Sequence, residues 1–254
     1  MSTRDITRRL RQAIIGLACL ASAVPVPAAV LNLSPLMLSL APDERAAGLD
    51  ITNQAASPVT LQIRLMRWTQ DGDRNLYETA PGWVISPPMV VVPGGQSQLL
   101  RVIRRQIEQA PVEQAYRVFI DELPGADAPA GGAVRVLMRY SLPLFVEPNQ
   151  AGLPDVGWTL QSCGKGWYLR GDYQGQRHFK LLGYSISQHG KRLAETPDGL
   201  LGYILAGRSF GLAIDDVTAP QGEDGLRIRV RSPAGDQEAA LRLAKDAAGC
   251  PVQS

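Results

Sequence analysis

Apolar and polar residues alternate along many short segments of this 254-residue chain. Leu49 and Ile51 flank a polar residue, and Leu61, Ile63 and Leu65 repeat the same spacing. Successive side chains of a β-strand point to opposite faces, so this period of two predicts strands with one buried and one solvated face. The 25 glycines and 19 prolines are spread over many short segments, which favours turn-rich β structure over long helices.

Turn residues divide the segment from Val30 to Pro148 into seven predicted strands. The predicted strands are Leu31–Leu40, Ala46–Asn53, Pro58–Trp68, Val84–Val92, Gln98–Arg104, Ala115–Leu123 and Ala133–Val146. Seven short strands over a segment of this length predict an immunoglobulin-like β-sandwich.

The run from Pro148 to Pro154 breaks the alternation and predicts a linker. Further β-rich segments follow it, and the last of these, Glu238–Leu243, is also compatible with a short helix. The sequence therefore predicts an all-β chain, with an immunoglobulin-like domain over residues 29–148 and a second β-sandwich over residues 149–254.

The predicted strand Ala133–Val146 has two chemically different faces. One face carries a row of bulky apolar residues, namely Val134, Val136, Met138, Tyr140 and Leu142. The opposite face carries Arg135 and Arg139. An apolar row of this kind at the boundary between two β domains suggests a strand that pairs with another protein.

The first 28 residues have the composition of a secretory signal peptide. A basic segment is followed by an apolar run from Ala13 to Val24 and by the small residues Val26-Pro27-Ala28, where cleavage is expected. The apolar run is shorter than the about 20 residues that a membrane-spanning helix needs. Export is therefore predicted, with a signal anchor as the alternative.

Removal of the signal peptide leaves two cysteines, Cys163 and Cys250. Two thiols of an exported chain are expected to form a disulfide in an oxidising compartment. This bond would close a loop of about 87 residues and stabilise the fold by about 4–5 kcal/mol. The alternative is two buried free thiols.

Signals for catalysis are weak in this sequence. Gly207-Arg208-Ser209-Phe210-Gly211 matches a nucleophile elbow, but no His follows His189, so an ordinary turn is predicted. His178 and His189 have no partner at the spacing of metal ligands, and no phosphate-binding glycine loop is present. A net charge of +2 is too small to indicate nucleic-acid binding. We expect no enzyme activity, cofactor, metal site, small-molecule substrate or nucleic-acid partner.

Arg117 and Arg139 are the charges that most need an explanation, because each lies on a largely apolar strand. An unpaired charge in an apolar site is strongly unfavourable, so a buried arginine needs an anionic partner. The sixth and seventh strands of an immunoglobulin-like sandwich are neighbours, so both guanidinium groups can contribute to one carboxylate site. In the alternative, Arg117 pairs with Asp50 or Glu122 and Arg139 faces the surface.

Motifs in order along the first domain resemble the periplasmic chaperones of the chaperone–usher pilus pathway, the PapD-like chaperones. These motifs are Leu49-Asp50-Ile51-Thr52-Asn53, Arg67-Trp68-Thr69-Gln70-Asp71-Gly72, Ser86-Pro87-Pro88-Met89, Gln98-Leu99-Leu100-Arg101-Val102, Tyr116-Arg117-Val118-Phe119-Ile120-Asp121-Glu122-Leu123-Pro124 and Met138-Arg139-Tyr140-Ser141-Leu142-Pro143-Leu144-Phe145. The second and last of them are most similar to the archaic branch, which serves spore-coat-U-type pili. The second domain resembles the family mainly in length and in Leu201-Gly202-Tyr203.

The resemblance implies two immunoglobulin-like domains in a boomerang arrangement and a location in the periplasm. Pilus subunits of this pathway lack their final strand, and the chaperone supplies one by donor-strand complementation. The resemblance assigns the supplied side chains to Val134, Val136, Met138 and Tyr140. It assigns the anchor for the carboxylate at the subunit's C-terminus to Arg117 and Arg139.

The expected partners are therefore pilus subunits (pilins) and an outer-membrane usher, and the free protein is expected to be capable of self-association through its exposed strand. Two functions of other classes remain as alternatives. One is an exported immunoglobulin-like adhesin or ligand-binding module, and the other is a secreted hydrolase that uses Ser209.

Overall fold

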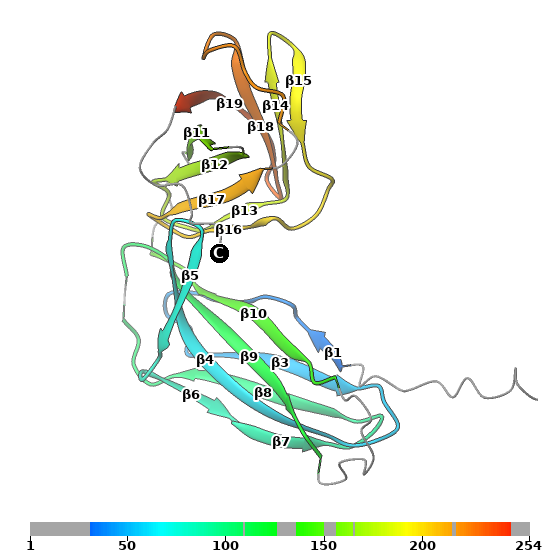
Figure 1. The fold of residues 1–254 in the computed structure, drawn as a ribbon. Coiled ribbons are helices and arrows are strands. Elements are labelled where there is room, and N and C mark those ends of the chain that lie inside the picture. Colours follow the sequence, from blue (N-terminus) through cyan, green and yellow to red (C-terminus); the bar gives the residue numbers. More distant parts are fainter. Residues whose placement is uncertain are drawn as a thin grey trace, which may run out of the picture.

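The computed structural model describes residues 31–108, 110–125, 136–149, 156–164, 166–214 and 217–244. All the regular structure among these residues is β-strand, and none of them forms a helix long and apolar enough to cross a membrane. The strands build two lobes that meet at an angle, residues 31–149 in one and 156–244 in the other (Figure 1). The prediction of an all-β chain with two sandwich units is confirmed. The predicted signal peptide lies outside the described residues.

Two sheets face each other in the N-terminal lobe. The first sheet has the strand order β1 (Leu31–Ser34), β3 (Ala46–Asn53), β8 (Ser97–Arg104) and β6 (Trp83–Ser86). The second has the order β2 (Leu38–Leu40), β10 (Arg139–Val146), β9 (Gln114–Leu123), β4 (Val59–Asp71) and β5 (Arg74–Thr79), and β7 (Met89–Val92) also pairs with β4. Alternate residues of these strands, such as Ile51, Leu61, Val118 and Leu144, are fully or almost fully buried between the sheets.

Two of the predicted strands are each divided between the two sheets, so the prediction that they are continuous was wrong. Leu31–Leu40 becomes β1 in the first sheet and β2 in the second, where β2 runs parallel to β10. Val84–Val92 becomes part of β6 and β7, again in different sheets. A Ser-Pro pair, Ser34-Pro35 or Ser86-Pro87, lies at each change of sheet. Proline has no backbone N–H to donate to a ladder, so a strand is readily interrupted there.

The remaining differences in this lobe concern strand ends. β4 continues to Asp71 and pairs with β5, an additional strand that follows the predicted hairpin turn at Gly72. The last strand was predicted to begin at Ala133, but β10 begins at Arg139, and residues 136–138 are described without strand structure.

The C-terminal lobe is a sandwich made from one sheet that curves around its core, so that Leu160 and Leu169 lie in one buried cluster with Ile186 and Ile228. Its strand order is β15 (Lys191–Glu195), β14 (Gly183–Gln188), β18 (Leu226–Ser232), β19 (Gly235–Ala244), β11 (Val156–Cys163), β12 (Gly166–Tyr173) and β17 (Ser209–Ile214), and β13 (Phe179–Leu181) pairs with β16 (Gly202–Ile204) separately. β19 is a strand and not the short helix that was the alternative. The turn predicted around Ser209 is confirmed, because Gly207 has φ of 63° and Arg208 donates to the carbonyl of Leu205 immediately before β17.

A buried asparagine joins two turns at the end of the N-terminal lobe that lies away from the other lobe. The side chain of Asn53 donates to the carbonyl oxygens of Ser57 and Val92, at 2.8 and 3.0 Å. Gly94 lies against the same turn, and a Cβ atom on it would be 2.2 Å from the carbonyl oxygen of Ala56. The two turns can therefore approach this closely only where residue 94 has no side chain.

We expect Gly94→Ala to lower the free energy of unfolding by about 1–3 kcal/mol, because the added methyl group meets backbone atoms that cannot move independently. Gly82→Ala is the matched control, since nothing lies within 4 Å of a Cβ atom at that position. Urea denaturation of both variants measures the difference. Equal stability of the two variants would contradict the expectation.

Candidate partner-binding site

The two lobes meet on the outer face of the second sheet of the N-terminal lobe. Trp68 on β4, Ala115 on β9 and Phe145 on β10 form a small buried cluster with Tyr203 and Leu205 of the C-terminal lobe. The rings of Trp68 and Tyr203 pack edge to face, with centroids 5.8 Å apart and an interplanar angle of 84°. Such a pair is favourable beyond the area that it buries. The junction is therefore an apolar contact with defined ring geometry.

Hydrogen bonds between the lobes surround this cluster. The Gln70 side-chain amide donates to the carbonyl of Tyr203 at 2.7 Å and accepts from the N–H of Leu205 at 2.8 Å. The Glu113 carboxylate lies 2.8 Å from both the backbone nitrogen and Nδ1 of His178, whose ring stacks on Phe145. These buried polar groups have partners across the junction, which fixes how the lobes are joined.

Arg117 extends from β9 onto this aromatic cluster. Its Cζ atom lies 3.8 Å from the centroid of the Trp68 ring and 5.6 Å from that of Tyr203. Its Nε atom is buried without a hydrogen-bond partner, and no ion pair joins Arg117 to an acidic group among the described residues. Burial lowers the pKa of Arg117, while the nearby phenols of Tyr77 and Tyr203 act in the opposite direction. A cation held over aromatic faces, with hydrogen-bonding capacity to spare, suits an incoming carboxylate.

Arg139 has a different environment. It forms an ion pair with Asp121, which Arg64 also contacts at 2.8 Å, and the guanidinium carbons of both arginines lie about 6 Å from the centre of the Phe119 ring. The Arg139 side chain remains 63% exposed. Arg139 is therefore already paired with a carboxylate in this structure, whereas Arg117 is not.

The strand register sets the distance between the two arginines. β9 and β10 are antiparallel neighbours, with Arg117 opposite Pro143 and Arg139 opposite Asp121. Both arginines lie on the outer face of the sheet, but four residues separate them along the strands, or about 13 Å at about 3.3 Å per residue. They do not lie side by side. The alternative pairing of Arg117 with Asp50 or Glu122 is not observed either.

The apolar face of β10 changes from buried to exposed toward the N-terminal end of the strand. Leu142, Leu144 and Val146 face the lobe's own core, and Tyr140 is half-buried against it. Met138 and Val136, which continue the same alternation, are 45% and 74% exposed. Val134 lies outside the described residues. The chain thus presents apolar side chains beyond the point where its own core ends.

One edge of β10 also has free backbone groups. Glu122 N–H donates to the carbonyl of Met138, and Glu147 N–H donates to the carbonyl of Leu40. Because hydrogen-bonding directions alternate along a strand, even-numbered residues of β10 bond to β9 and odd-numbered residues point to the opposite edge. β2 covers that edge only opposite Leu144–Val146. Within the described ranges no strand pairs with the backbones of Leu137, Arg139 and Ser141 on this edge, and we call it the open edge. It ends at Pro143, a residue without an N–H group.

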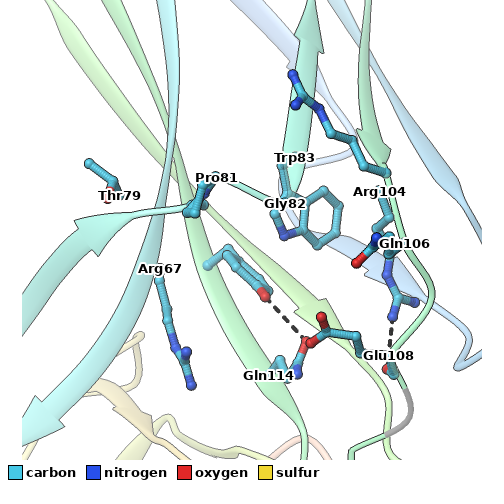
Figure 2. A pocket seen from close by; sticks show the side chains of 12 residues that line it. Arg67, Thr79, Pro81, Gly82, Trp83, Arg104, Gln106, Glu108 and Gln114 are labelled. Atoms are coloured by element: carbon cyan, nitrogen blue, oxygen red, sulfur yellow. Dashed lines mark hydrogen bonds between the residues drawn. The ribbon is translucent and has the colours of Figure 1, made fainter.

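A hollow of about 460 Å³ lies at the other end of the strands, beside the junction (Figure 2). The Arg104 guanidinium that borders it donates to the carbonyl oxygens of Pro42, Glu44 and Glu108, at 3.0–3.3 Å. The Tyr116 hydroxyl bonds to the side chain of Gln114. These bonds hold the loop after β8 in place and leave the Arg104 guanidinium and the Tyr116 hydroxyl little capacity for a ligand.

The structure describes one of the two cysteines of the predicted disulfide. Cys163 is the last residue of β11, and Cys250 lies outside the described residues, so the predicted disulfide stays a prediction. No three His, Cys, Asp or Glu side chains of the described ranges come together in a way that could hold a metal ion.

Sequence reasoning missed the aromatic surface under Arg117 and the role of Asp121. Trp68 lies in a quoted motif, but only the fold brings it beside Tyr203, 135 positions later in the sequence. Asp121 lies directly opposite Arg139 on the antiparallel strands β9 and β10, so their pairing follows once the strand alignment is known.

Comparison with known proteins is consistent with this arrangement. Residues 30–152 match the family described as "Pili and flagellar-assembly chaperone, PapD N-terminal domain". No curated protein sequence matched the chain.

Several solved structures have a similar fold. A chaperone–tip adhesion subunit complex, CsuC–CsuE from the archaic Csu pili of Acinetobacter baumannii, has 22% identity and a TM-score of 0.66, over 85% of this chain and 99% of that one. The SafA pilin–SafB chaperone complex of Salmonella enterica has 15% identity and a TM-score of 0.58, over 85% and 98%. The E. coli chaperone DraB has 21% identity and a TM-score of 0.56, over 84% and 97%. At these identities the likeness shows the fold.

Acid should weaken the Arg64–Asp121–Arg139 contacts. Burial raises the pKa of Asp121. Hydrogen bonds from Arg139 and Arg64, together with their positive charges, lower the pKa by a larger amount, so it lies below its ordinary value. A carboxyl group of this kind stabilises the fold above its unfolded-state pKa of about 3.9, and the stabilisation is lost as the pH falls through its folded-state pKa.

We therefore expect Asp121→Asn to lower the free energy of unfolding by about 1–2 kcal/mol at pH 7 and by less below about pH 4. Urea denaturation of both proteins between pH 7 and pH 3 measures the difference. A difference that stays constant down to pH 3 would show that ionised Asp121 does not stabilise the fold.

Proposed function

Because residues 30–152 belong to the PapD N-terminal domain family of pili and flagellar-assembly chaperones, we propose that this protein is a periplasmic chaperone for pilus subunits. It binds a subunit by donor-strand complementation and delivers it to an outer-membrane usher. The function needs no cofactor, metal or catalytic group, since recognition relies on backbone hydrogen bonds and apolar contacts.

The observation that carries this proposal is the combination of an open strand edge with exposed apolar side chains. An unpaired edge is a template for another strand, and soluble proteins usually protect it. Here the open edge at Leu137, Arg139 and Ser141 adjoins exposed Val136 and Met138. A subunit that lacks a strand would gain both hydrogen-bonding partners and side chains for its groove.

Burial of the donor side chains supplies enough free energy for capture. Each Val or Met side chain that moves from water into an apolar groove contributes about 1.5–3 kcal/mol. Val134, Val136 and Met138 are the proposed groove-filling residues, with Tyr140 as a further contact. The half-buried position of Tyr140 against its own core limits how far it can enter a partner.

The proposed carboxylate anchor is centred on Arg117. It lies opposite Pro143, where the open edge of β10 ends, so a partner strand that follows this edge would terminate beside the guanidinium group. Arg139 is the second proposed member, but its Nε atom is already paired with Asp121, so only its other guanidinium nitrogens would bind the subunit. Arg117 is therefore expected to contribute more.

The second candidate, an exported adhesin or ligand-binding module, needs a site that binds without a pilus subunit. The hollow beside Trp83 is the feature that would serve it, but the Arg104 guanidinium and the Tyr116 hydroxyl there are engaged within the protein. The open edge favours the chaperone.

We expect Val136→Asp to abolish capture of pilus subunits, because a carboxylate would have to enter an apolar groove. The measurement is co-purification from the periplasm with each pilus subunit encoded beside this chain's gene. Leu99→Asp, an exposed position on β8 of the opposite sheet, is the control and should capture normally. If no encoded subunit co-purifies with the wild-type protein, the proposed function is wrong.

We expect Arg117→Ala to weaken subunit affinity by about ten- to a hundredfold, as loss of a charge-assisted hydrogen bond does, and Arg139→Ala to weaken it less. Titration of the subunit into each purified variant measures affinity, and thermal unfolding checks the fold. Arg101→Ala, an exposed arginine on β8, controls for loss of charge. If Arg117→Ala and the double variant Arg117→Ala/Arg139→Ala both bind the subunit with unchanged affinity, the proposed carboxylate anchor is wrong. That result would not bear on donor-strand binding.

A further inference from the structure

Asp121 and Glu122 are adjacent carboxylates on β9 whose side chains point to opposite faces of the sheet. Each contacts the point where β10 begins. Asp121 pairs with the guanidinium group of Arg139 on the outer face, and Glu122 contacts the backbone of Met138 on the inner face. Asp121 and Glu122 of β9 therefore hold the first residue of β10, Arg139, and the residue before it, Met138.

Glu122 binds both backbone polar groups of Met138. Its N–H donates to the Met138 carbonyl at 3.0 Å, as a regular ladder requires, and its Oε2 atom accepts the Met138 N–H at 3.2 Å. In an ordinary antiparallel pair the backbone carbonyl of Glu122 would accept that N–H. A side chain has replaced a ladder bond, which is how polar side chains end regular pairing. The ladder stops here, immediately before the exposed donor residues.

This arrangement is costly for the free protein. The Glu122 residue is only 8% exposed, and its Oε1 atom is buried without a hydrogen-bond partner among the described residues. A buried carboxylate oxygen without a donor is unfavourable, and native proteins rarely keep one without a reason. An apolar side chain of similar size would remove the unpaired oxygen, and the N–H of exposed Met138 could then bind water, so the lobe should be at least as stable.

We propose that Asp121 and Glu122 form a two-sided clamp that fixes the root of the donor segment and so sets its register toward the partner. A shift of one residue along a strand turns every side chain to the opposite face. With Met138 and Arg139 held from opposite sides, Val136 and Met138 stay on the same face as Leu142. Fixing the root before the encounter also lowers the ordering cost of binding. The inference rests on the proposed chaperone function and assigns positioning residues to it.

The clamp is tested with Glu122→Leu, which removes the acceptor, and Glu122→Gln, which keeps one. We expect Glu122→Leu to speed hydrogen exchange of the Met138 amide in the free protein by about tenfold or more and to weaken capture of the encoded pilus subunit by about tenfold. Its melting temperature should be equal to or above that of the wild type. Glu122→Gln should restore both exchange protection and capture. Glu78→Leu, an exposed carboxylate on β5, is the matched control and should change neither.

Three results would overturn the clamp. They are unchanged Met138 exchange in Glu122→Leu, full capture despite faster exchange, and a fall in melting temperature that accounts for the lost capture. Asp121→Asn is expected to be less stable, so it is assayed at a temperature where it remains fully folded. There it should also weaken capture, with the Leu144 amide unaffected, because only the root of the segment is released. If the wild-type protein captures no encoded subunit, the proposed function fails, while the exchange measurements on the free protein still decide whether Glu122 holds Met138.

Discussion

Among the residues that the structure describes, the backbone of β10 has strand partners on both sides only over its last three residues, Leu144–Val146, where β2 lies beside it. Toward its N-terminal end β9 continues to pair with it, but the opposite edge is open. This asymmetry follows from a proline, because the chain changes sheet at Ser34-Pro35 and β2 is consequently too short to cover the whole edge. Exposed Leu36 and Met37 immediately precede β2, so the uncovered edge is also bordered by apolar surface. An incoming strand finds both kinds of contact in one place.

The junction of the lobes gives this edge a defined end. Trp68, Phe145 and Tyr203 pack together where β10 reaches the C-terminal lobe, and Arg117 lies over that cluster. Aromatic faces hold the cation and exclude water, without supplying the negative charge that would neutralise it. The position of Arg117 therefore depends on both lobes, although its strand belongs to one. This gives a physical reason for two lobes that meet at a fixed angle: one supplies the strand edge, and both together supply the cation at its end.

Much of the fold could be predicted from the sequence because burial imposes a period of two on every strand. Ile51, Leu61 and Val118 are buried as their alternation predicts. The divided strands could not be predicted, since Pro35 and Pro87 mark interruptions without saying whether the chain continues in the same sheet. Tyr140 and Leu142 lie toward the core, as the predicted apolar row from Val134 to Leu142 requires, but the point at which the chain leaves the core depends on where Glu122 ends the ladder. Arg117 and Arg139 lie on neighbouring strands, as predicted, whereas the distance between them depends on register, and register depends on long-range pairing.

The central claim is that a partner strand adds to the open edge of β10, and hydrogen exchange of individual amides tests it most directly. The backbone N–H groups of Arg139 and Ser141 point to the open edge, whereas that of Tyr140 points to β9. On binding of a pilus subunit we expect the Arg139 and Ser141 amides to become protected by about a hundredfold or more, while Tyr140 is protected in both states. Unchanged exchange of Arg139 and Ser141 in a stable complex would show that the subunit binds elsewhere.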